Sequence, residues 1–422
     1  MTTTASELQT KGAAVKKAAR ELARCATPVK NKALHAIADA LIAHSDEIIA
    51  ANKIDVAAAI ESGLEAAWLD RLKLDAGKIA AIAADTRDVA ALPDPIGELT
   101  DGRTLPNGMQ VARRRVPLGV IAAIYESRPN VTVDISALCL KSGNGCILRG
   151  GKETINSNKV IARVIREALA SAGAPADAVQ LIEDTDRSII GELLAMKDVI
   201  DLVVPRGGEA LIQFVAENAK MPVLLGGRGV VHTYVDASAD LAKAVPIVNN
   251  AKVRKISNCN ALDTLLVHSA IAPAFLSELG GEWAGKVEVH ADERSAAVLR
   301  EVGVDSLPIV DGDWDREWLA MACGVRVVDS LDEALEHIHE HSTGHSDAIL
   351  TEDYSAAQRF LDEVDTAVCY VNASTQFTDG AQFGLGAEII DSTQKTIARG
   401  PVGLREITTY KWIVYGNGQT RP

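Results

Sequence analysis

The chain has 422 residues, of which 47% are hydrophobic, 24% charged and 4% aromatic. This length and apolar content predict two or three folded domains and exclude disorder as the dominant state. The 43 basic and 57 acidic residues give a net charge of −14, which excludes a general attraction to nucleic acid or anionic lipid. An apolar fraction dominated by Ala, Val, Leu and Ile favours helices packed on strands over an aromatic-rich barrel.

The N-terminal half is predicted to begin with helices and then to alternate. Residues 11–92 are expected to be helical almost throughout, and the segment 30–49 repeats apolar side chains every three or four residues: Leu34, Ile37, Ala38, Leu41 and Ile42. From about Met109, short β-branched runs follow, with helices at 157–172 and 191–196 between them. The strands expected here are 118–124, 145–148, 179–182, 200–204 and 230–235.

A second alternating series begins near residue 256, which places a domain seam at about 236–258. Its expected strands are 264–267, 287–290, 325–328, 348–350 and 366–371. Its expected helices are 272–279, 295–301, 331–337 and 354–364. Such alternation predicts parallel sheets covered by helices, which is an α/β fold.

The cysteines and the N-terminus indicate a compartment. The six cysteines form no C-x-x-C pair, so neither a zinc ribbon nor a disulfide scaffold is expected: Cys25, Cys139, Cys146, Cys259, Cys323 and Cys369. Residues 1–9 lack the apolar core of a secretory signal, and no apolar run approaches the roughly 18–20 residues of a membrane span. We expect a cytoplasmic protein with neither membrane nor nucleic-acid partners.

Cys259 is the candidate nucleophile. Lys252, Arg254 and Lys255 lie within the seven preceding residues, and the apolar run 262–267 follows. Nearby positive charge favours the reactive thiolate, and a polar loop that leads into a strand commonly exposes functional groups. The alternative is a small buried hydrophobe, which describes most cysteines outside disulfides.

Two glycine turns are candidate anion sites. Gly207 and Gly208 separate the expected strand 200–204 from a helical segment, an arrangement that points free N–H groups outward. The dinucleotide fingerprint G-x-G-x-x-G is absent, so an ordinary tight turn explains the pair equally well. Arg149 and Lys152 flank a second glycine pair and suit a phosphate, although a solvated turn is the alternative.

Other catalytic arrangements find little support. Four histidines crowd the end of one expected helix, but no acidic or thiol ligand completes a metal set, so we expect no metal site: His337, His339, His341 and His345. A serine hydrolase of the α/β type is disfavoured because the G-x-S-x-G elbow is missing.

Six segments form a combined pattern that is spread over about residues 10–418, nearly the whole chain. They are Val116–Asp134, Lys141–Glu153, Cys259–His268, Tyr370–Gly380, Phe383–Ile389 and Ala398–Gly403. Together these segments resemble the γ-glutamyl phosphate reductase (glutamate-5-semialdehyde dehydrogenase) family, a branch of the aldehyde dehydrogenase superfamily.

The resemblance implies an aldehyde dehydrogenase-like α/β fold with two parallel-sheet domains and a small oligomerisation β flap. It assigns 1–240 to an NADP-binding domain, 241–370 to a catalytic domain, and 371–422 to a segment that returns to the cofactor domain and forms the flap. The implied reaction is NADPH-dependent reduction of L-glutamate 5-phosphate to the semialdehyde and phosphate, in proline biosynthesis. We expect a homo-oligomer, and the lability of an acyl phosphate suggests glutamate 5-kinase as metabolic partner.

The resemblance also implies roles for single residues. Cys259 becomes the nucleophile that forms a thioester. Gly207 and Gly208 lie near the cofactor pyrophosphate, and Glu317 holds the nicotinamide ribose. Arg149 and Lys152 lie where the superfamily handles the adenosine ribose, so their charges should favour a 2′-phosphate and hence NADPH.

Three further assignments concern the substrate. Asn130 is the candidate side chain for holding the oxyanion, and Arg128 for binding the substrate carboxylate. Lys252 and Arg254, with Lys255, are candidates for stabilising the departing phosphate, although a role as solvated charges is the alternative. Leu224 stands where hydrolytic aldehyde dehydrogenases carry the glutamate that activates water.

The sequence departs from the family pattern in two places, before Cys259 (256–258) and at 224–229, which leaves kinetics and substrate fit open. An acylating aldehyde dehydrogenase that uses coenzyme A is the alternative enzyme. A catalytically inert member that acts as a binding subunit is the alternative from another class.

Overall fold

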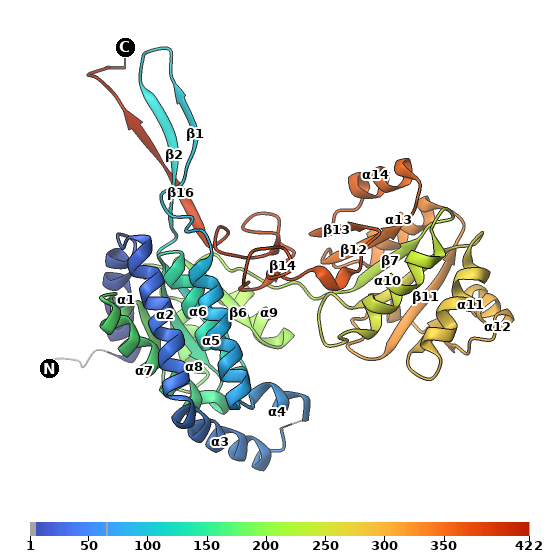
Figure 1. Ribbon diagram of the computed structural model, residues 1–422, viewed down its shortest axis with the longest axis horizontal. Helices are drawn as coiled ribbons and strands as arrows, with labels where there is room; N and C mark the ends of the chain where they lie inside the picture. Colours follow the sequence, from blue (N-terminus) through green and yellow to red (C-terminus); the bar gives the residue numbers. More distant parts are fainter. Residues whose placement is uncertain (1–5, 65, 422) are drawn as a thin grey trace. The chain divides into compact units, whose positions relative to one another are not determined.

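The computed structural model describes residues 6–64 and 66–421 and contains two compact units. The first unit comprises residues 1–225, 384–390 and 402–422, and the second comprises 226–383 and 391–401. Figure 1 colours the chain from blue to red, and the red C-terminal segments appear in both units. Within the described residues, no helix combines the length and the apolar character needed to cross a membrane.

The first unit is built on a four-stranded sheet in the order β5-β4-β3-β6, in which neighbouring strands run parallel. Every residue of β3 and β4 is buried, as expected for parallel strands covered on both faces. The strands are β3 (Val120–Tyr125), β4 (Gly145–Gly150), β5 (Val179–Leu181) and β6 (Leu202–Arg206).

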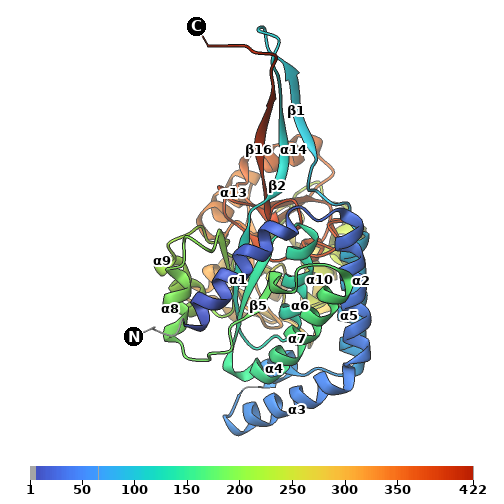
Figure 2. The same ribbon diagram turned by 90° about the vertical axis from the view of Figure 1, so that its left-hand side faces the viewer.

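Helices cover this sheet on both sides. Residues of α1, α8 and α9 share one apolar core with β3, β4 and β6. Helix α6 packs on β3 and β4 and on α5, while α2 packs against α5 and α7, and Figure 2 shows this helical group beside the sheet. The helices are α1 (Glu7–Leu22), α2 (Thr27–Ala43), α3 (Ser45–Glu61), α4 (Ala66–Leu72), α5 (Ala76–Ala91), α6 (Asn130–Lys141), α7 (Ile155–Ala172), α8 (Ser188–Leu194) and α9 (Glu209–Asn218).

The flap is a three-stranded antiparallel sheet in the order β1-β2-β16 that projects from the first unit in both views. It combines β1 (Leu99–Thr104), β2 (Gln110–Pro117) and the C-terminal β16 (Thr408–Tyr415). The guanidinium of Arg113 stacks on the rings of Tyr410 and Trp412, at 4.4 and 4.9 Å from their centroids. These cation–π contacts tie β2 to β16 across the sheet.

The second unit contains a seven-stranded sheet in the order β10-β9-β11-β8-β7-β12-β13, whose strands run parallel. A short antiparallel pair, β14 (Asp391–Ser392) with β15 (Gly400–Pro401), also belongs to this unit. The sheet strands are β7 (Val231–Val235), β8 (Leu262–His268), β9 (Glu288–Ala291), β10 (Leu307–Pro308), β11 (Ala322–Val328), β12 (Ser346–Leu350) and β13 (Val368–Val371).

Each face of this sheet has its own apolar core. Residues of α10, α11 and α12 form one core with β7, β8, β9 and β11. Residues of α13 and α14 form the other with β7, β8, β11 and β12, around the fully buried ring of Phe360. The helices are α10 (Leu241–Val253), α11 (Ala272–Trp283), α12 (Glu293–Glu301), α13 (Leu331–His341) and α14 (Tyr354–Glu363).

The structure confirms the α/β class with two parallel sheets and moves the expected domain boundaries. The expected boundary at 240/241 is wrong, because β7 pairs with β8 and so residues 226–240 belong to the second unit. The segment 371–383 also stays in the second unit, and 391–401 comes back to it. The expected helix 30–49 is interrupted at His44, and Ile42, placed on its apolar face, is 45% exposed.

Candidate active site

Cys259 lies in the turn between α10 and β8, and its side chain is half-buried. Gly229 lies two residues before β7, and His345 immediately precedes β12. Strands β8, β7 and β12 are parallel neighbours in the sheet, so their amino ends meet at one edge. This topology brings together three residues that are far apart in the sequence.

The sulfur of Cys259 has a histidine and a carboxylate beside it. Three atoms lie within 4.8 Å of one another: the sulfur of Cys259, a ring nitrogen of His345 and a carboxylate oxygen of Asp391. The His345 ring is only 2% exposed, its Nδ1 lies 2.9 Å from Ser346 Oγ, and that hydroxyl lies 2.7 Å from Thr378 Oγ1. Burial lowers the pKa of His345 to about 4, so the imidazole is neutral near neutral pH.

Gly229 fixes the backbone of the Cys259 turn from the other side. A Cβ built on Gly229 would lie 1.6 Å from the carbonyl oxygen of Cys259, so no other residue fits without moving the chain. The Gly229 N–H points at Glu317 Oε1, 3.4 Å away, and the next N–H, of Val230, donates to Thr343 Oγ1 at 2.9 Å. The structure therefore brings the sequence-predicted Glu317 to the Cys259 region.

Two of the cations predicted to bind phosphate, Lys252 and Arg254, differ in their exposure to solvent. Lys252 is fully buried, and its ammonium donates to the Leu262 carbonyl at 2.8 Å and lies 4.0 Å from Asp263. Burial raises the pKa of Asp263 to about 6 although Lys252 opposes the shift. Arg254 is exposed and lies 3.4 Å from Gln376 Oε1. Lys252 thus holds the start of β8 in place, and the structure does not favour it as a phosphate ligand.

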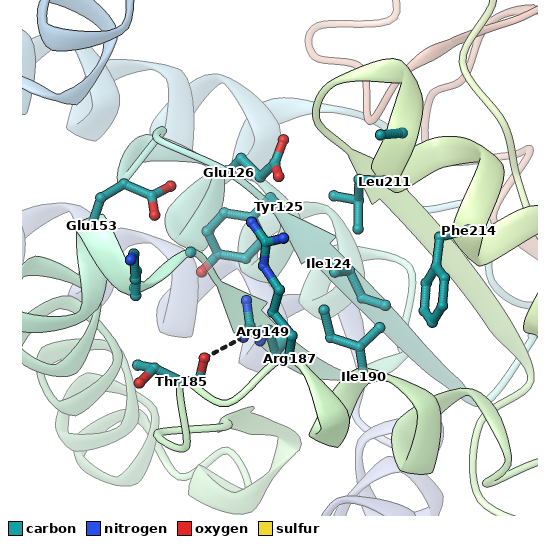
Figure 3. A pocket seen from close by; sticks show the side chains of 13 residues that line it. Ile124, Tyr125, Glu126, Arg149, Glu153, Thr185, Arg187, Ile190, Leu211 and Phe214 are labelled. Atoms are coloured by element: carbon teal, nitrogen blue, oxygen red, sulfur yellow. Dashed lines mark hydrogen bonds between the residues drawn. The ribbon is translucent and has the colours of Figure 1, made fainter. Parts of the chain in front are cut away.

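The first unit holds a cavity of about 680 Å³ at the carboxyl ends of β3 and β4. This volume lies in the range of small-molecule and cofactor sites. Figure 3 shows apolar side chains on one wall and charged ones on the other. The lining residues are Ile124, Tyr125, Glu126, Arg149, Gly151, Lys152, Glu153, Thr185, Arg187, Ile190, Ala210, Leu211 and Phe214.

Of the two cations predicted for a nucleotide phosphate, one is already engaged. Arg149 is 6% exposed, and its guanidinium donates to the carbonyls of Gly150 and Thr185, at 3.1 and 2.9 Å. Arg149 therefore secures the loop that precedes α8. Lys152 and Arg187 are exposed and line the cavity, and sequence reasoning had not singled out Arg187.

The predicted anion cradle at Gly207 and Gly208 is occupied by a carboxylate of the chain itself. The Gly208 N–H, at the start of α9, donates to Glu126 Oε2 at 2.9 Å. A Cβ on Gly207 would lie 2.4 Å from the same oxygen, so a larger residue there would push the Glu126 side chain aside. The cradle does bind an anion, and Glu126 is that anion in this structure.

The remaining predicted residues also lie in the first unit. Asn130 is the first residue of α6, and one N–H of its amide donates to Asp134 at 2.9 Å. Burial raises the pKa of Asp134 to about 6. Arg128, two residues earlier, is half-buried, and Leu224 is 1% exposed with its N–H donating to the Val203 carbonyl.

The expectation that no metal site exists rested on a premise that the fold contradicts. A thiol and a carboxylate do stand beside one of the four histidines, His345: Cys259 lies in the turn before β8 of the same sheet, and Asp391 lies on β14 of the short antiparallel pair. The others lie elsewhere: His337 is buried against Arg326 and His232, whereas His341 contacts Asp315.

His337 predicts acid sensitivity of folding. Burial, together with the nearby Arg326 guanidinium and the imidazoles of His232 and His341, lowers the pKa of His337 to about 2. The unfolded chain, with a pKa near the ordinary 6.5, takes up the proton first, so this contribution to stability is present above that pH and lost below it. Between about pH 7.5 and about pH 5.5, the free energy of unfolding should fall by about 1 kcal/mol less in His337→Gln than in the wild type. Urea denaturation measures this, with the exposed His339→Gln as control. An equal fall in all three proteins would contradict the assignment.

Comparison with known proteins shows to which family the chain belongs. The model of the aldehyde dehydrogenase family matches residues 2–298. A γ-glutamyl phosphate reductase from Dehalococcoides mccartyi is 54% identical over 417 residues, covering 98% of each chain, and one from Psychromonas ingrahamii is 52% identical over 99% of this chain and 100% of its own. The crystal structure of γ-glutamyl phosphate reductase from Thermotoga maritima superimposes with a TM-score of 0.96, at 47% identity over 99% of this chain and 100% of its own.

An engineered glycolyl-CoA reductase with bound NADP⁺ shares the fold at 18% identity and a TM-score of 0.67. The fold and the end-to-end similarity therefore lead to one conclusion. The chain belongs to the aldehyde dehydrogenase family of oxidoreductases and, within it, to the γ-glutamyl phosphate reductases.

Proposed function

We propose that this chain reduces L-glutamate 5-phosphate to L-glutamate 5-semialdehyde and phosphate with NADPH, the second step of proline biosynthesis from glutamate. Relatives named γ-glutamyl phosphate reductase match it from end to end. The observation that carries the chemistry is the half-buried Cys259 thiol in a turn, with a ring nitrogen of His345 within 4.8 Å.

The first chemical step is acyl transfer to Cys259. The sulfur forms a bond to the acyl carbon, the carbon–oxygen bond to phosphate breaks, and phosphate leaves with the electron pair. In this proposal the ring of His345, which has a nitrogen within 4.8 Å of the other ligand atoms of the cluster and is neutral near neutral pH, takes the thiol proton. The neighbouring carboxylate of Asp391 disfavours the thiolate form of Cys259. The reaction therefore needs a group that accepts the thiol proton.

The second step turns the thioester into the aldehyde. Members of the aldehyde dehydrogenase family use nicotinamide dinucleotides, and NADPH, when bound, supplies the hydride for the thioester carbon. The sulfur then leaves that carbon as the aldehyde forms, and one proton balances the reaction. Leu224 cannot accept a proton from water, which disfavours hydrolysis of the thioester. Asn130 as oxyanion donor, Arg128 as carboxylate ligand and Arg254 as phosphate ligand stay predictions.

The cavity of the first unit fits an adenine nucleotide. Apolar side chains of Ile190, Leu211 and Phe214 offer a surface for a base, and Lys152 and Arg187 offer positive charge for a 2′-phosphate. The structure shifts our assignment of this charge from Arg149 to Arg187, because the Arg149 guanidinium is committed to main-chain carbonyls. Glu317, held at Gly229, remains the predicted ribose ligand.

Removing both cations should weaken NADPH selectively. In Lys152→Ala/Arg187→Ala, the KM for NADPH should rise about 10- to 100-fold while the KM for NADH stays unchanged, because only NADPH carries the 2′-phosphate. Steady-state kinetics with both cofactors measure the ratio. Lys159→Ala/Arg166→Ala removes the same charge from α7 outside the cavity lining and is the control. An unchanged preference in the cavity variant would refute the assignment.

Glu126 should compete with the cofactor for the Gly208 N–H. A pyrophosphate that binds at the start of α9 has to displace this carboxylate. Glu126→Gln removes the negative charge, so the Kd for NADP⁺ should fall about three- to tenfold. Titration of the protein with NADP⁺ in a calorimeter tests this, with Glu192→Gln on α8 as control. Weaker binding would show instead that Glu126 accepts hydrogen bonds from the cofactor.

The acyl acceptor distinguishes the proposed reaction from its alternatives. In the oxidative direction, NADP⁺ reduction with glutamate semialdehyde should depend strictly on phosphate. Turnover with coenzyme A in place of phosphate would identify an acylating aldehyde dehydrogenase. Turnover without either acceptor would mean that water reaches the thioester despite Leu224. A protein that binds NADPH but turns over in none of these conditions would be an inert binding subunit.

The flap supports the expectation of a homo-oligomer. Strands β1 and β16 are the edges of their sheet, and β16 exposes Tyr410, Trp412 and Tyr415 by 49, 46 and 62%. Exposed strand edges with aromatic side chains suit pairing with a second copy of the chain.

A further inference from the structure

We propose that Cys259, His345 and Asp391 form a zinc site, at which Zn²⁺ reversibly captures the candidate nucleophile. The site lies wholly in the second unit. It goes beyond the proposed reaction and does not depend on it, because metal binding requires only these three side chains.

The geometry needs a small adjustment. The three ligand atoms lie within 4.8 Å of one another. Zinc bonds of about 2.0 to 2.3 Å in a tetrahedron place ligand atoms roughly 3.3 to 3.8 Å apart, so an inward movement of about 1 Å suffices. Cys259 and Asp391 are half-buried, and such side chains can make this movement without repacking the core.

His345 supplies the independent observation that a ligand is missing. Its Nδ1 is engaged by the Ser346 hydroxyl, whereas its Nε2 is buried and has no hydrogen-bond partner within the described part of the chain. The Ser346 hydroxyl is held in turn by Thr378, whose hydroxyl lies 2.8 Å from Tyr370 Oη. Metal-binding histidines almost always have one ring nitrogen held by a hydrogen bond while the other binds the metal. In His345, Nδ1 would be the held nitrogen and Nε2 the ligand.

The donor set selects the metal. A thiolate, an imidazole nitrogen and a carboxylate suit Zn²⁺, whereas Mg²⁺ and Ca²⁺ prefer oxygen ligands only. The thiol releases its proton to solvent as the sulfur–zinc bond forms, and the negative charges of thiolate and carboxylate then balance the two positive charges of the ion. Three protein ligands leave the fourth position to water.

Capture of the sulfur has a functional consequence. A zinc-bound thiolate is not available to attack an acyl phosphate, so Zn²⁺ should inhibit the enzyme and a chelator should restore it. The bound metal should also shield the thiol from alkylating and oxidising reagents.

Cobalt absorption tests the site directly, because Co²⁺ bound by a thiolate shows a sulfur-to-metal charge-transfer band. We expect the full-length protein to bind one Co²⁺ with this band and Zn²⁺ to displace it. The band should be lost in Cys259→Ser, and the metal affinity should fall at least about tenfold in His345→Ala and Asp391→Asn. Cys369→Ser and His341→Ala, which change a thiol and a histidine outside the cluster, should bind as the wild type does.

Three results would overturn the proposal. The first is the absence of the band in the wild type. The second is an affinity that does not change in His345→Ala and Asp391→Asn, which would mean that Cys259 binds metal without them. The third concerns the unmodified protein. Protection of the wild-type thiol from iodoacetamide by Zn²⁺ requires no variant and so stands even if a variant fails to fold, and its absence would also refute the site. The phosphate dependence of turnover is a separate readout, which keeps failure of this proposal distinct from failure of the proposed reaction.

Discussion

Cys259→Ala should abolish phosphate-dependent reduction of NADP⁺ by glutamate semialdehyde, with kcat reduced by about 10⁴-fold or more. Alanine has no group that can form the acyl intermediate, and the other described titratable groups of the cluster, His345 and Asp391, are a base and an acid. The expected loss is large because every turnover passes through the thioester. Initial rates at saturating phosphate and cofactor measure it.

A matched control separates chemistry from folding. Cys369→Ala changes a half-buried thiol on β13 outside the cluster, and its activity should remain close to that of the wild type. Both variants should melt within a few degrees of the wild type. Residual activity above about one hundredth in Cys259→Ala, at unchanged stability, would mean that another nucleophile carries the reaction.

Gly229→Ala should damage both stability and activity although Gly229 carries no chemistry. The added methyl would meet the Cys259 carbonyl oxygen at 1.6 Å, so the turn that holds the thiol has to move. A displacement of about 1 Å of a reacting group costs about 100-fold in rate, and the forced backbone shift should cost about 2 to 4 kcal/mol of unfolding free energy. Denaturant unfolding and kcat, measured on one preparation, test both parts.

The control for this substitution is another glycine in the same unit. Gly281 lies in α11, and a Cβ built there meets no described heavy atom within 4 Å. Gly281→Ala should be neutral or stabilising by up to about 1 kcal/mol, because alanine is the better helix former. Full activity in Gly229→Ala would contradict the prediction, because it would show that activity does not depend on the present position of the Cys259 turn.

The α/β architecture was readable from the sequence because buried parallel strands leave compact apolar runs, and ten such runs match strands of the two sheets. The flap hairpin was not found from its residues. Strand β1 is exposed along its whole length, so the sequence Leu99–Thr104 carries no alternation between a buried and a solvated face.

Only part of the candidate site could be predicted from the sequence. Its residues are distant along the chain and come together only through the order of the strands in the sheet. Cys259 was found from its flanking cations, yet one of them, Lys252, is buried under β8. His345 was grouped with the histidines that precede it along the chain, although the other members of its cluster come from the turn before β8 and from β14. A signal was present, since His345, like Cys259, stands just before an apolar strand.

Arg149 and Glu126 illustrate the same limit in the first unit. A charge or a free N–H on a glycine turn suggests an external anion, but whether a carbonyl or a carboxylate of the protein itself takes that place first depends on the fold. Arg149 is taken by carbonyls, and the Gly208 N–H is taken by Glu126.

The path of the chain between the units also constrains how the protein is made. The chain passes from one unit to the other four times, after residues 225, 383, 390 and 401. The flap strand β16 follows the whole second unit along the sequence and completes the flap of the first unit. On the ribosome, the first unit therefore waits for residues 402–422 to emerge, long after its four-stranded sheet has been synthesised. Truncation at the first crossing would leave the unit without β16, so separate production of the two units calls for a rearranged gene in which 384–390 and 402–422 are joined to residues 1–225.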